Sequence, residues 1–258
     1  MDFFKPQVKH FGFKMAAIIV AGIVGIFVEM LLTARLGLNG DTWESLGEIA
    51  GGLVMLTLAM WWLHLPLLAK PQHVRLGILA VMTMLVVGCL DYGPLPTFSA
   101  HRLGRAVLFG LSAGIFEEVI TRGLLLFLFY RHTPRHLSAF WWSGVMSALC
   151  FGAIHLTNLG SNQDLKQTLI QVLYATALGL GAAGIYLLTH NLGFTIFLHA
   201  FFDAFSYYFS PGGASAGSYI GDNWQDQLFL WVMVVVHLAV GIYLIWLVSR
   251  EAKHRAVS

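Results

Sequence analysis

Residues 15–36 read MAAIIVAGIVGIFVEMLLTARL, an apolar run in which Glu29 and Arg35 are the only charged side chains. A helix needs about 20 consecutive apolar residues to cross the hydrocarbon core of a bilayer. The run is long enough, and although lysines precede it, it lacks the small-residue cleavage site of a signal peptide. It therefore predicts a retained transmembrane helix.

Seven further apolar runs follow, separated by short polar or Gly/Pro-containing breaks. The eight runs occupy residues 15–36, 48–69, 76–90, 105–130, 137–155, 169–188, 194–209 and 228–248. Their connections are short, and no internal repeat or low-complexity tract divides the chain. Because only helices and closed barrels satisfy their backbone groups in lipid, runs of this length predict an all-α fold. We expect a polytopic membrane bundle of about eight transmembrane helices.

The composition of the 258-residue chain supports this fold class. Hydrophobic residues make up 57% of it and charged residues 11%, and the mean hydropathy is +0.72. Fifteen basic and thirteen acidic side chains are too few to cover a water-facing surface of this size, which excludes a soluble globular enzyme. The net charge of +2 and the lack of a basic block away from the membrane-flanking segments argue against nucleic acid as a partner. The expected partner is the lipid bilayer, and the oligomeric state is open.

Ionisable side chains inside apolar runs carry the functional information. Each costs at least ~2.5 kcal/mol at the bilayer centre unless it is paired or hydrated. In the fourth run, Glu118 and Arg122 are four residues apart, so they share a helix face and can pair. Glu117 points about 100° away from Glu118 around the helix. It therefore needs a proton, a metal ion or a partner on another helix.

Two other runs contribute polar side chains of the same kind. His199 and Asp203 are four residues apart in the seventh run, and His155 closes the fifth run one turn after Phe151. A packing network could hold each of these groups separately. However, an acid, a base and two imidazoles on three helices are what a single reaction site requires, so we expect them to converge.

A charge count indicates what such a site must contain. With Glu117, Glu118 and Asp203 ionised, Arg122 protonated and both histidines neutral, the cluster has a charge of minus two. A divalent cation held by imidazole and carboxylate would offset this charge, and Zn²⁺ is the metal that such ligands commonly bind. Two added protons would serve equally well. The residues leave both alternatives open.

The motifs Glu117-Glu118-x-x-x-Arg122, Phe151-x-x-x-His155 and His199-x-x-x-Asp203 resemble, in order and spacing, those of the CPBP intramembrane metalloprotease family. This family includes the type II CAAX prenyl endopeptidases and bacterial bacteriocin-immunity proteins. The motifs span residues 117–203, about a third of the chain. The resemblance implies a membrane endopeptidase that hydrolyses a peptide bond of a membrane-associated or lipidated, CAAX-like protein or peptide.

The same resemblance implies a role for each residue. Glu117 looks like the general base that activates water, assisted by His155. Glu118 and Arg122 look like the pair that fixes the helix and tunes the site. His199 and Asp203 look like the pair that binds the oxyanion or completes a metal site. In the metal-assisted version, the candidate Zn²⁺ ligands are Glu117, His155, His199 and Asp203.

Sequence motifs of other protease classes are absent or poorly placed. The chain has no His-Glu-x-x-His sequence. Ser215 lies in a Gly-x-Ser-x-Gly sequence, but in a Gly/Ser-rich loop with no preceding strand, so we do not expect a serine nucleophile. A non-enzymatic scaffold or immunity partner and a proton-coupled transporter are the alternatives from other functional classes.

The predicted organisation has three parts: residues 1–14 as an interfacial basic and aromatic segment, residues 15–248 as one transmembrane protease-like domain, and residues 249–258 as a basic tail. Ten basic residues fall on the side of the termini: Lys5, Lys9, Lys14, Lys70, Arg75, Arg131, Arg135, Arg250, Lys253 and Arg255. Four fall on the other side: Arg35, Arg102, Arg105 and Lys166. We therefore expect a multi-pass cell-membrane protein with both termini in the cytoplasm.

Overall fold

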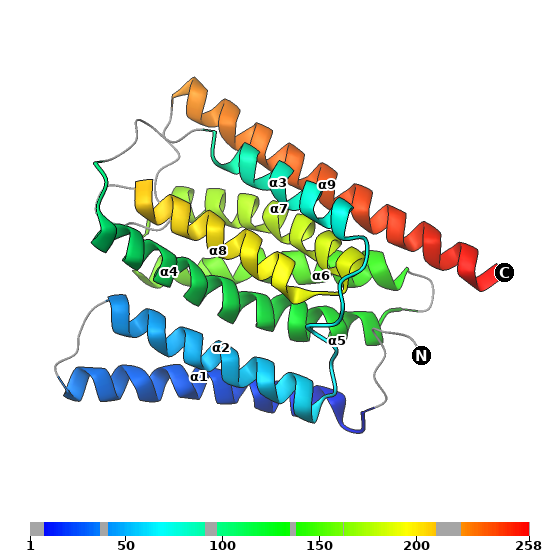
Figure 1. Ribbon diagram of the computed structural model, residues 1–258, viewed down its shortest axis with the longest axis horizontal. Helices are drawn as coiled ribbons and strands as arrows, with labels where there is room; N and C mark the ends of the chain where they lie inside the picture. Colours follow the sequence, from blue (N-terminus) through cyan, green and yellow to red (C-terminus); the bar gives the residue numbers. More distant parts are fainter. Residues whose placement is uncertain are drawn as a thin grey trace.

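The computed structural model describes residues 8–36, 41–90, 97–134, 138–161, 163–209 and 223–257, and the named elements within these ranges are all helices. They are α1 (Phe11–Arg35), α2 (Asp41–Trp62), α3 (Val74–Gly88), α4 (Ala100–Glu118), the π-helix η1 (Val119–Leu125), α5 (Leu126–Arg131), α6 (Ala139–Ile154), the 3₁₀ helix η2 (His155–Ser161), α7 (Leu165–Thr189), α8 (Leu192–Phe209) and α9 (Trp224–Val257). The expected all-α bundle is confirmed (Figure 1). Ser215 lies outside the described residues.

Each of the eight expected runs corresponds to a helical stretch, with some corrected boundaries. The fourth run is one continuous stretch in which α4 passes through η1 into α5. The last run is longer than expected, because α9 continues through residues 249–257. The end of the second run at residue 69 is wrong, since α2 ends at Trp62. Residues 63–69 instead form a non-helical segment with Leu63, Leu65 and Leu67 buried.

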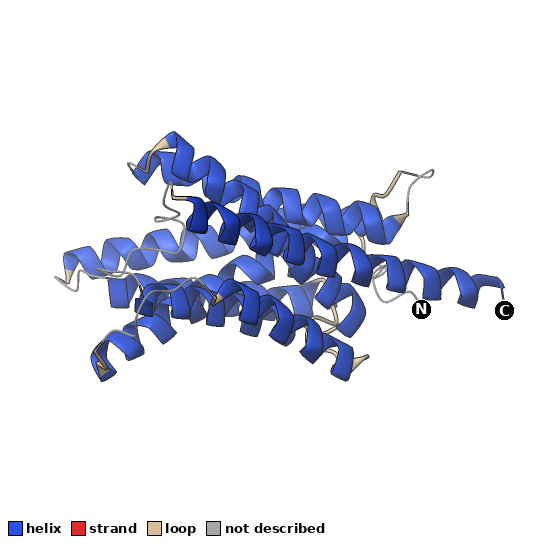
Figure 2. Cartoon of the chain, turned by 90° about the horizontal axis from the view of Figure 1, so that it is seen from above, coloured by secondary structure: helices blue, strands red, loops and turns tan. Residues whose placement is uncertain are grey.

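The helices lie side by side with their axes roughly aligned, and α7 lies near the middle of the bundle (Figures 1 and 2). It packs against α6 and α9, while α4 packs against α8 and α2, and α1 covers α2. The start of α1 and the end of α9 lie at the same end of the bundle (Figure 1). This arrangement places α4 against α8, and it places η1, which follows α4, against both α6 and α8.

Small residues allow the site helices to approach closely. A Cβ atom on Gly110 of α4 would lie 2.1 Å from the carbonyl oxygen of Ala200 on α8. Glycine at this position therefore brings the two backbones together, as small residues do between membrane helices. The contact fixes the distance between the helices that carry Glu117 and His199.

The segment that follows α2 sets the depth at which α8 begins. The backbone N–H of Leu192 donates to the carbonyl of Leu67 at 2.8 Å, and the side-chain amide of Asn191 donates to the carbonyl of Ala69 at 2.6 Å. The first residues of α8 are thus bonded to residues 67–69. This anchoring satisfies backbone groups that would otherwise be unpaired in an apolar bundle.

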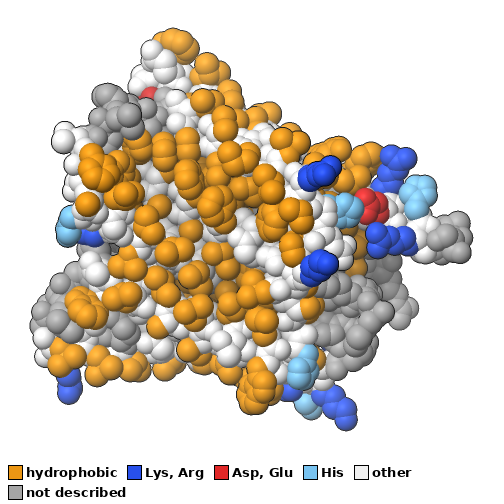
Figure 3. Space-filling view, viewed as in Figure 1, with side chains coloured by type: hydrophobic (Ala, Val, Ile, Leu, Met, Phe, Trp, Pro, Cys, Tyr) orange, Lys and Arg blue, Asp and Glu red, His pale blue; other side chains and the backbone are white. Residues whose placement is uncertain are grey.

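The protein surface is apolar over most of its area. Hydrophobic side chains cover the middle of the face shown in Figure 3, and Lys and Arg side chains lie near its ends. Large hydrophobic residues such as Phe27, Trp61 and Val235 are more than half exposed. Five helices in the described ranges are long and apolar enough to cross a membrane. These features agree with a membrane protein.

Candidate active site

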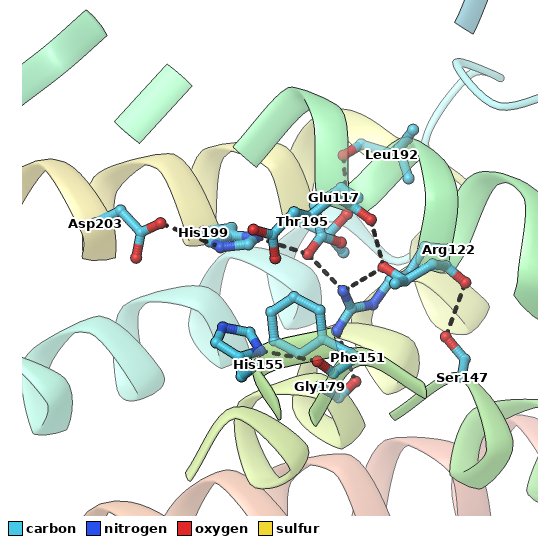
Figure 4. A network of polar contacts seen from close by, with 12 residues as sticks. Glu117, Arg122, Ser147, Phe151, His155, Gly179, Leu192, Thr195, His199 and Asp203 are labelled. Carbon is cyan, nitrogen blue, oxygen red and sulfur yellow. Dashed lines mark hydrogen bonds and ion pairs between the residues drawn. The ribbon is translucent and has the colours of Figure 1, made fainter. Parts of the chain in front are cut away.

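The fourth-run motif forms a buried ion pair. An Nη1 proton of Arg122 is donated to Glu118 Oε1 at 2.6 Å, and both side chains are at most 1% exposed. Arg122 also donates to Thr121 Oγ1 at 2.6 Å and to the carbonyl of Gly179 on α7 at 3.1 Å, and its guanidinium lies over the Phe151 ring (Figure 4). The expected Glu118–Arg122 pairing is therefore present, and it also links η1 to α6 and α7.

His199 lies between two carboxylates. Its Nδ1 atom is 3.1 Å from Glu118 Oε1, and its Nε2 atom is 3.3 Å from Asp203 Oδ2 (Figure 4). An ionised carboxylate can only accept, so each ring nitrogen must carry a proton when both carboxylates are charged. In that state the ring supplies one of the two positive charges that would neutralise the cluster.

His155 reaches the same cluster from the first residue of η2, directly after α6. Its ring contacts the edge of Phe151 at a centroid distance of 5.2 Å, and His199 contacts the same phenyl ring at 5.3 Å. The Nδ1–H of His155 donates to the carbonyl of Phe151 at 2.9 Å, which leaves the lone pair of a neutral ring on Nε2. Phe151 thus separates the two imidazoles and holds both at one site.

Glu117 has different surroundings from Glu118. The two side chains diverge around α4, and Glu117 Oε2 is buried without a hydrogen-bond partner among the described residues. Glu117, His155, His199 and Asp203 line one cavity of about 290 Å³. A cavity of this size is near the lower end of those that take small ligands. Glu118 and Arg122 lie behind this cavity and do not line it.

Comparison with known proteins agrees with the geometry. Residues 99–205 match the family model described as Type II CAAX prenyl endopeptidase Rce1-like. This region of the chain is Rce1-like. The match confirms the family expected from the motifs and includes all six site residues. No curated protein and no solved structure matches the chain.

The Rce1-like match supports a peptidase of the CAAX type at the level of the family. The expected meeting of three motifs in one place is also present, since α4, η2 and α8 bring Glu117, His155 and His199 to a single cavity. The individual role of each residue and the identity of the substrate are matters for the proposal below.

The zinc prediction has a specific test in the arrangement of donors. Across the described ranges, no three His, Cys, Asp or Glu side chains are grouped so that they could hold a metal ion. Both nitrogens of His199 face carboxylates instead of a common point with His155. As arranged here, Glu117, His155, His199 and Asp203 do not fit a zinc centre. Zn²⁺ at this site stays a prediction from the sequence.

Polar residues that the sequence analysis did not single out also line the cavity. Glu48 of α2 lines it, as do Asn158 of η2 and Gln171 of α7. Glu48 stands at the start of an apolar run, so its sequence position signals a helix boundary as readily as a site residue. Asn158 and Gln171 are uncharged and lie in or beside a polar connection, where amides are common. Only the folded arrangement indicates that they belong to the site.

Proposed function

We propose that this protein is an intramembrane endopeptidase that hydrolyses a peptide bond of a membrane-associated or prenylated protein or peptide. The observation that carries the proposal is the unpaired, buried Oε2 atom of Glu117, which shares a cavity with His155 and His199. A carboxylate with no protein donor is available to bind a water molecule. Amide hydrolysis requires such a base together with groups that stabilise the oxyanion.

In the proposed reaction, Glu117 accepts a proton from water as the water oxygen attacks the carbonyl carbon of the substrate. The lone pair on His155 Nε2 accepts a hydrogen bond from the same water and orients it. The carbonyl oxygen becomes an oxyanion, and the carbon–nitrogen bond then breaks. Glu117 returns its proton to the departing nitrogen, so that the products are a carboxylic acid and an amine.

His199 is the proposed oxyanion partner, and Asp203 is the residue proposed to position it. An imidazolium N–H at Nε2 points toward Asp203, whose side chain is 21% exposed and lies on the cavity side. The developing oxyanion can accept this proton in a hydrogen bond, while Glu118 continues to hold Nδ1. Asp203 itself can donate only when protonated or through water. Its proposed task is therefore to position His199.

The proposed location is the cell membrane, crossed several times, with both termini in the cytoplasm. The excess of basic residues flanking the terminal side of the helices supports this orientation. The common position of the start of α1 and the end of α9 is compatible with it. The cavity would then be reached from within the bilayer or from one of its surfaces.

The test is cleavage of a prenylated CAAX peptide by the purified full chain in lipid nanodiscs. Replacing Glu117→Gln removes the base while keeping the side-chain shape, and we expect the rate to fall by about 10²–10⁴-fold. Glu44→Gln, an exposed change on α2, is the matched control and should leave the rate unaltered. Equal rates for wild type and Glu117→Gln would refute Glu117 as the base. A chelator arm in the same assay tests the zinc prediction.

A further inference from the structure

A second polar group lies in the cavity beside the proposed catalytic residues. The side-chain amide of Asn158 donates to Gln171 Oε1 at 2.7 Å, and Gln163 donates to the same oxygen at 3.2 Å. Asn158 and Gln171 both line the cavity, and Gln171 is only 5% exposed. The two amides are therefore held in place before any ligand arrives.

These hydrogen bonds leave one donor and one acceptor for a ligand. Gln171 uses its oxygen and retains the Nε2 protons, while Asn158 uses its nitrogen and retains Oδ1. Exchanging oxygen and nitrogen in all three amides preserves the pair and again leaves one donor and one acceptor. Asn158 Oδ1 and Gln171 Nε2 are not among the buried side-chain atoms of the described residues that lack a hydrogen-bond partner. A ligand in the cavity can thus reach both.

The 3₁₀ conformation of η2 fixes the position of this amide pair relative to the catalytic residues. A 3₁₀ helix has three residues per turn, so side chains three apart lie on the same face. Asn158 follows His155 by three residues in η2 (His155–Ser161), and both line the cavity. The amide pair and His155 therefore face the same cavity.

The neutral amides of Asn158 and Gln171 favour an uncharged hydrogen-bonding ligand. Both amides are neutral, so they complement an uncharged group in preference to a phosphate or a carboxylate. One residue of an extended peptide presents its N–H and its C=O on the same side, as in the hydrogen-bonded pairs of a β-ladder. A fixed acceptor beside a fixed donor matches this pattern, much as an exposed strand edge does.

We propose that Asn158 and Gln171 bind the backbone of an extended peptide substrate next to the bond that is cleaved. Asn158 Oδ1 accepts from a substrate N–H, and Gln171 Nε2 donates to a substrate C=O. Gln163 is a positioning residue that orients the Gln171 amide. This inference rests on the proposed endopeptidase function and assigns it a backbone-recognition subsite that is independent of substrate side chains.

The test measures binding separately from cleavage. A fluorescent prenylated CAAX peptide is titrated into the full chain carrying Glu117→Gln, in nanodiscs. Adding Gln171→Leu should weaken binding by about three- to tenfold, the usual cost of losing a neutral hydrogen bond. Gln167→Leu, one turn earlier on α7 and outside the cavity lining, is the matched control and should leave affinity unchanged.

An ester scan of the peptide identifies the backbone contact itself. Each backbone N–H near the cleaved bond is replaced in turn by an ester oxygen, which removes one donor without altering a side chain. One ester should weaken binding to the Glu117→Gln protein, and this penalty should disappear when Asn158→Leu is added. Equal penalties with and without Asn158→Leu would overturn the subsite.

The two proposals fail in different ways. Absence of peptide binding to the Glu117→Gln protein overturns the amide-pair subsite, whatever the wild-type protein cleaves. Loss of cleavage without loss of binding in that protein supports the catalytic role of Glu117 by itself. Binding that depends on Asn158 in a wild-type protein without peptidase activity would refute the proposed hydrolysis and keep the backbone contact.

Discussion

Glu117 and Glu118 are neighbours in the sequence but have opposite surroundings. Glu118 is 1% exposed, bonded to Arg122 at 2.6 Å and 3.1 Å from His199. Glu117 lines the cavity, whereas Glu118 does not, and the Oε2 atoms of both have no hydrogen-bond partner within the described part of the chain. One helix thus presents a carboxylate paired with Arg122 to the protein interior and a neighbouring carboxylate to the cavity.

The difference indicates how a membrane enzyme can hold several charges. A buried charge is tolerated when it is paired, and removing one partner leaves the other uncompensated. The pair of Glu118 and Arg122 connects η1 with α6 and α7, and Glu118 also contacts His199 Nδ1. Glu117 lines the cavity instead, where we propose that it accepts a proton from water.

The largest expected effect comes from breaking the ion pair between Glu118 and Arg122. Arg122→Leu removes the cation that neutralises Glu118 and should lower the free energy of unfolding by about 3–5 kcal/mol. We expect a strongly reduced yield of monodisperse protein and a lower Tm in detergent.

The double variant Arg122→Leu with Glu118→Leu is the control for this change. It removes both charges, and replacing a buried ion pair by apolar side chains is often close to neutral for stability. Recovery of most of the lost Tm would support charge imbalance as the cause. A Tm as low as that of Arg122→Leu would indicate that packing, and not the charge of Glu118, is responsible.

A smaller effect is expected from a change at Asp203, which lines the cavity. Asp203→Asn keeps an oxygen that accepts from His199 Nε2–H but removes the negative charge. The change from a charged to a neutral acceptor costs about 1 kcal/mol, so we expect roughly a fivefold fall in kcat/KM with an unchanged Tm. The cleavage assay checks this value. A loss as large as that of Glu117→Gln would assign Asp203 a direct part in the reaction.

The sequence predicts the helices and the pairing of Glu118 with Arg122, for a clear reason. Apolar runs specify helices because lipid leaves few alternatives, and ionisable residues within such runs need partners. The spacing in Glu118-x-x-x-Arg122 directly predicts the observed pair. Where an ionisable side chain is costly to bury in lipid and a partner lies four residues away on the same helix face, the pairing can be predicted before the fold is known.

Other features depend on tertiary contacts and could not be predicted from spacing. Counting residues along straight helices places His155 near one end of its predicted helix and His199 near the opposite end of another. The two would then lie at different depths in the membrane. The two meet at Phe151 in the structure. One contribution is the segment after α2, which ends that helix at Trp62 and bonds to the start of α8. Hydropathy does not distinguish such a buried segment from a helix end.

The contact between Asn158 and Gln171 could not be predicted from the sequence, for a different reason. Asn158 and Gln171 are 13 residues apart and belong to different elements, so no periodicity connects them. Neutral amides also cost less than charges and give no signal in an apolar run. Their relation to His155 depends on the 3₁₀ form of η2, which a propensity argument does not specify.

The most direct test compares Glu117→Gln and Glu118→Gln in a single preparation series, with Tm and cleavage of a prenylated CAAX peptide measured on each folded protein. We predict that Glu117→Gln keeps the wild-type Tm and loses cleavage by about 10²–10⁴-fold. Glu118→Gln should lower the Tm, because it leaves Arg122 without its carboxylate. A destabilised Glu117→Gln that still cleaves, beside a Glu118→Gln of unaltered Tm, would contradict the assignment of chemistry to one glutamate and structure to the other.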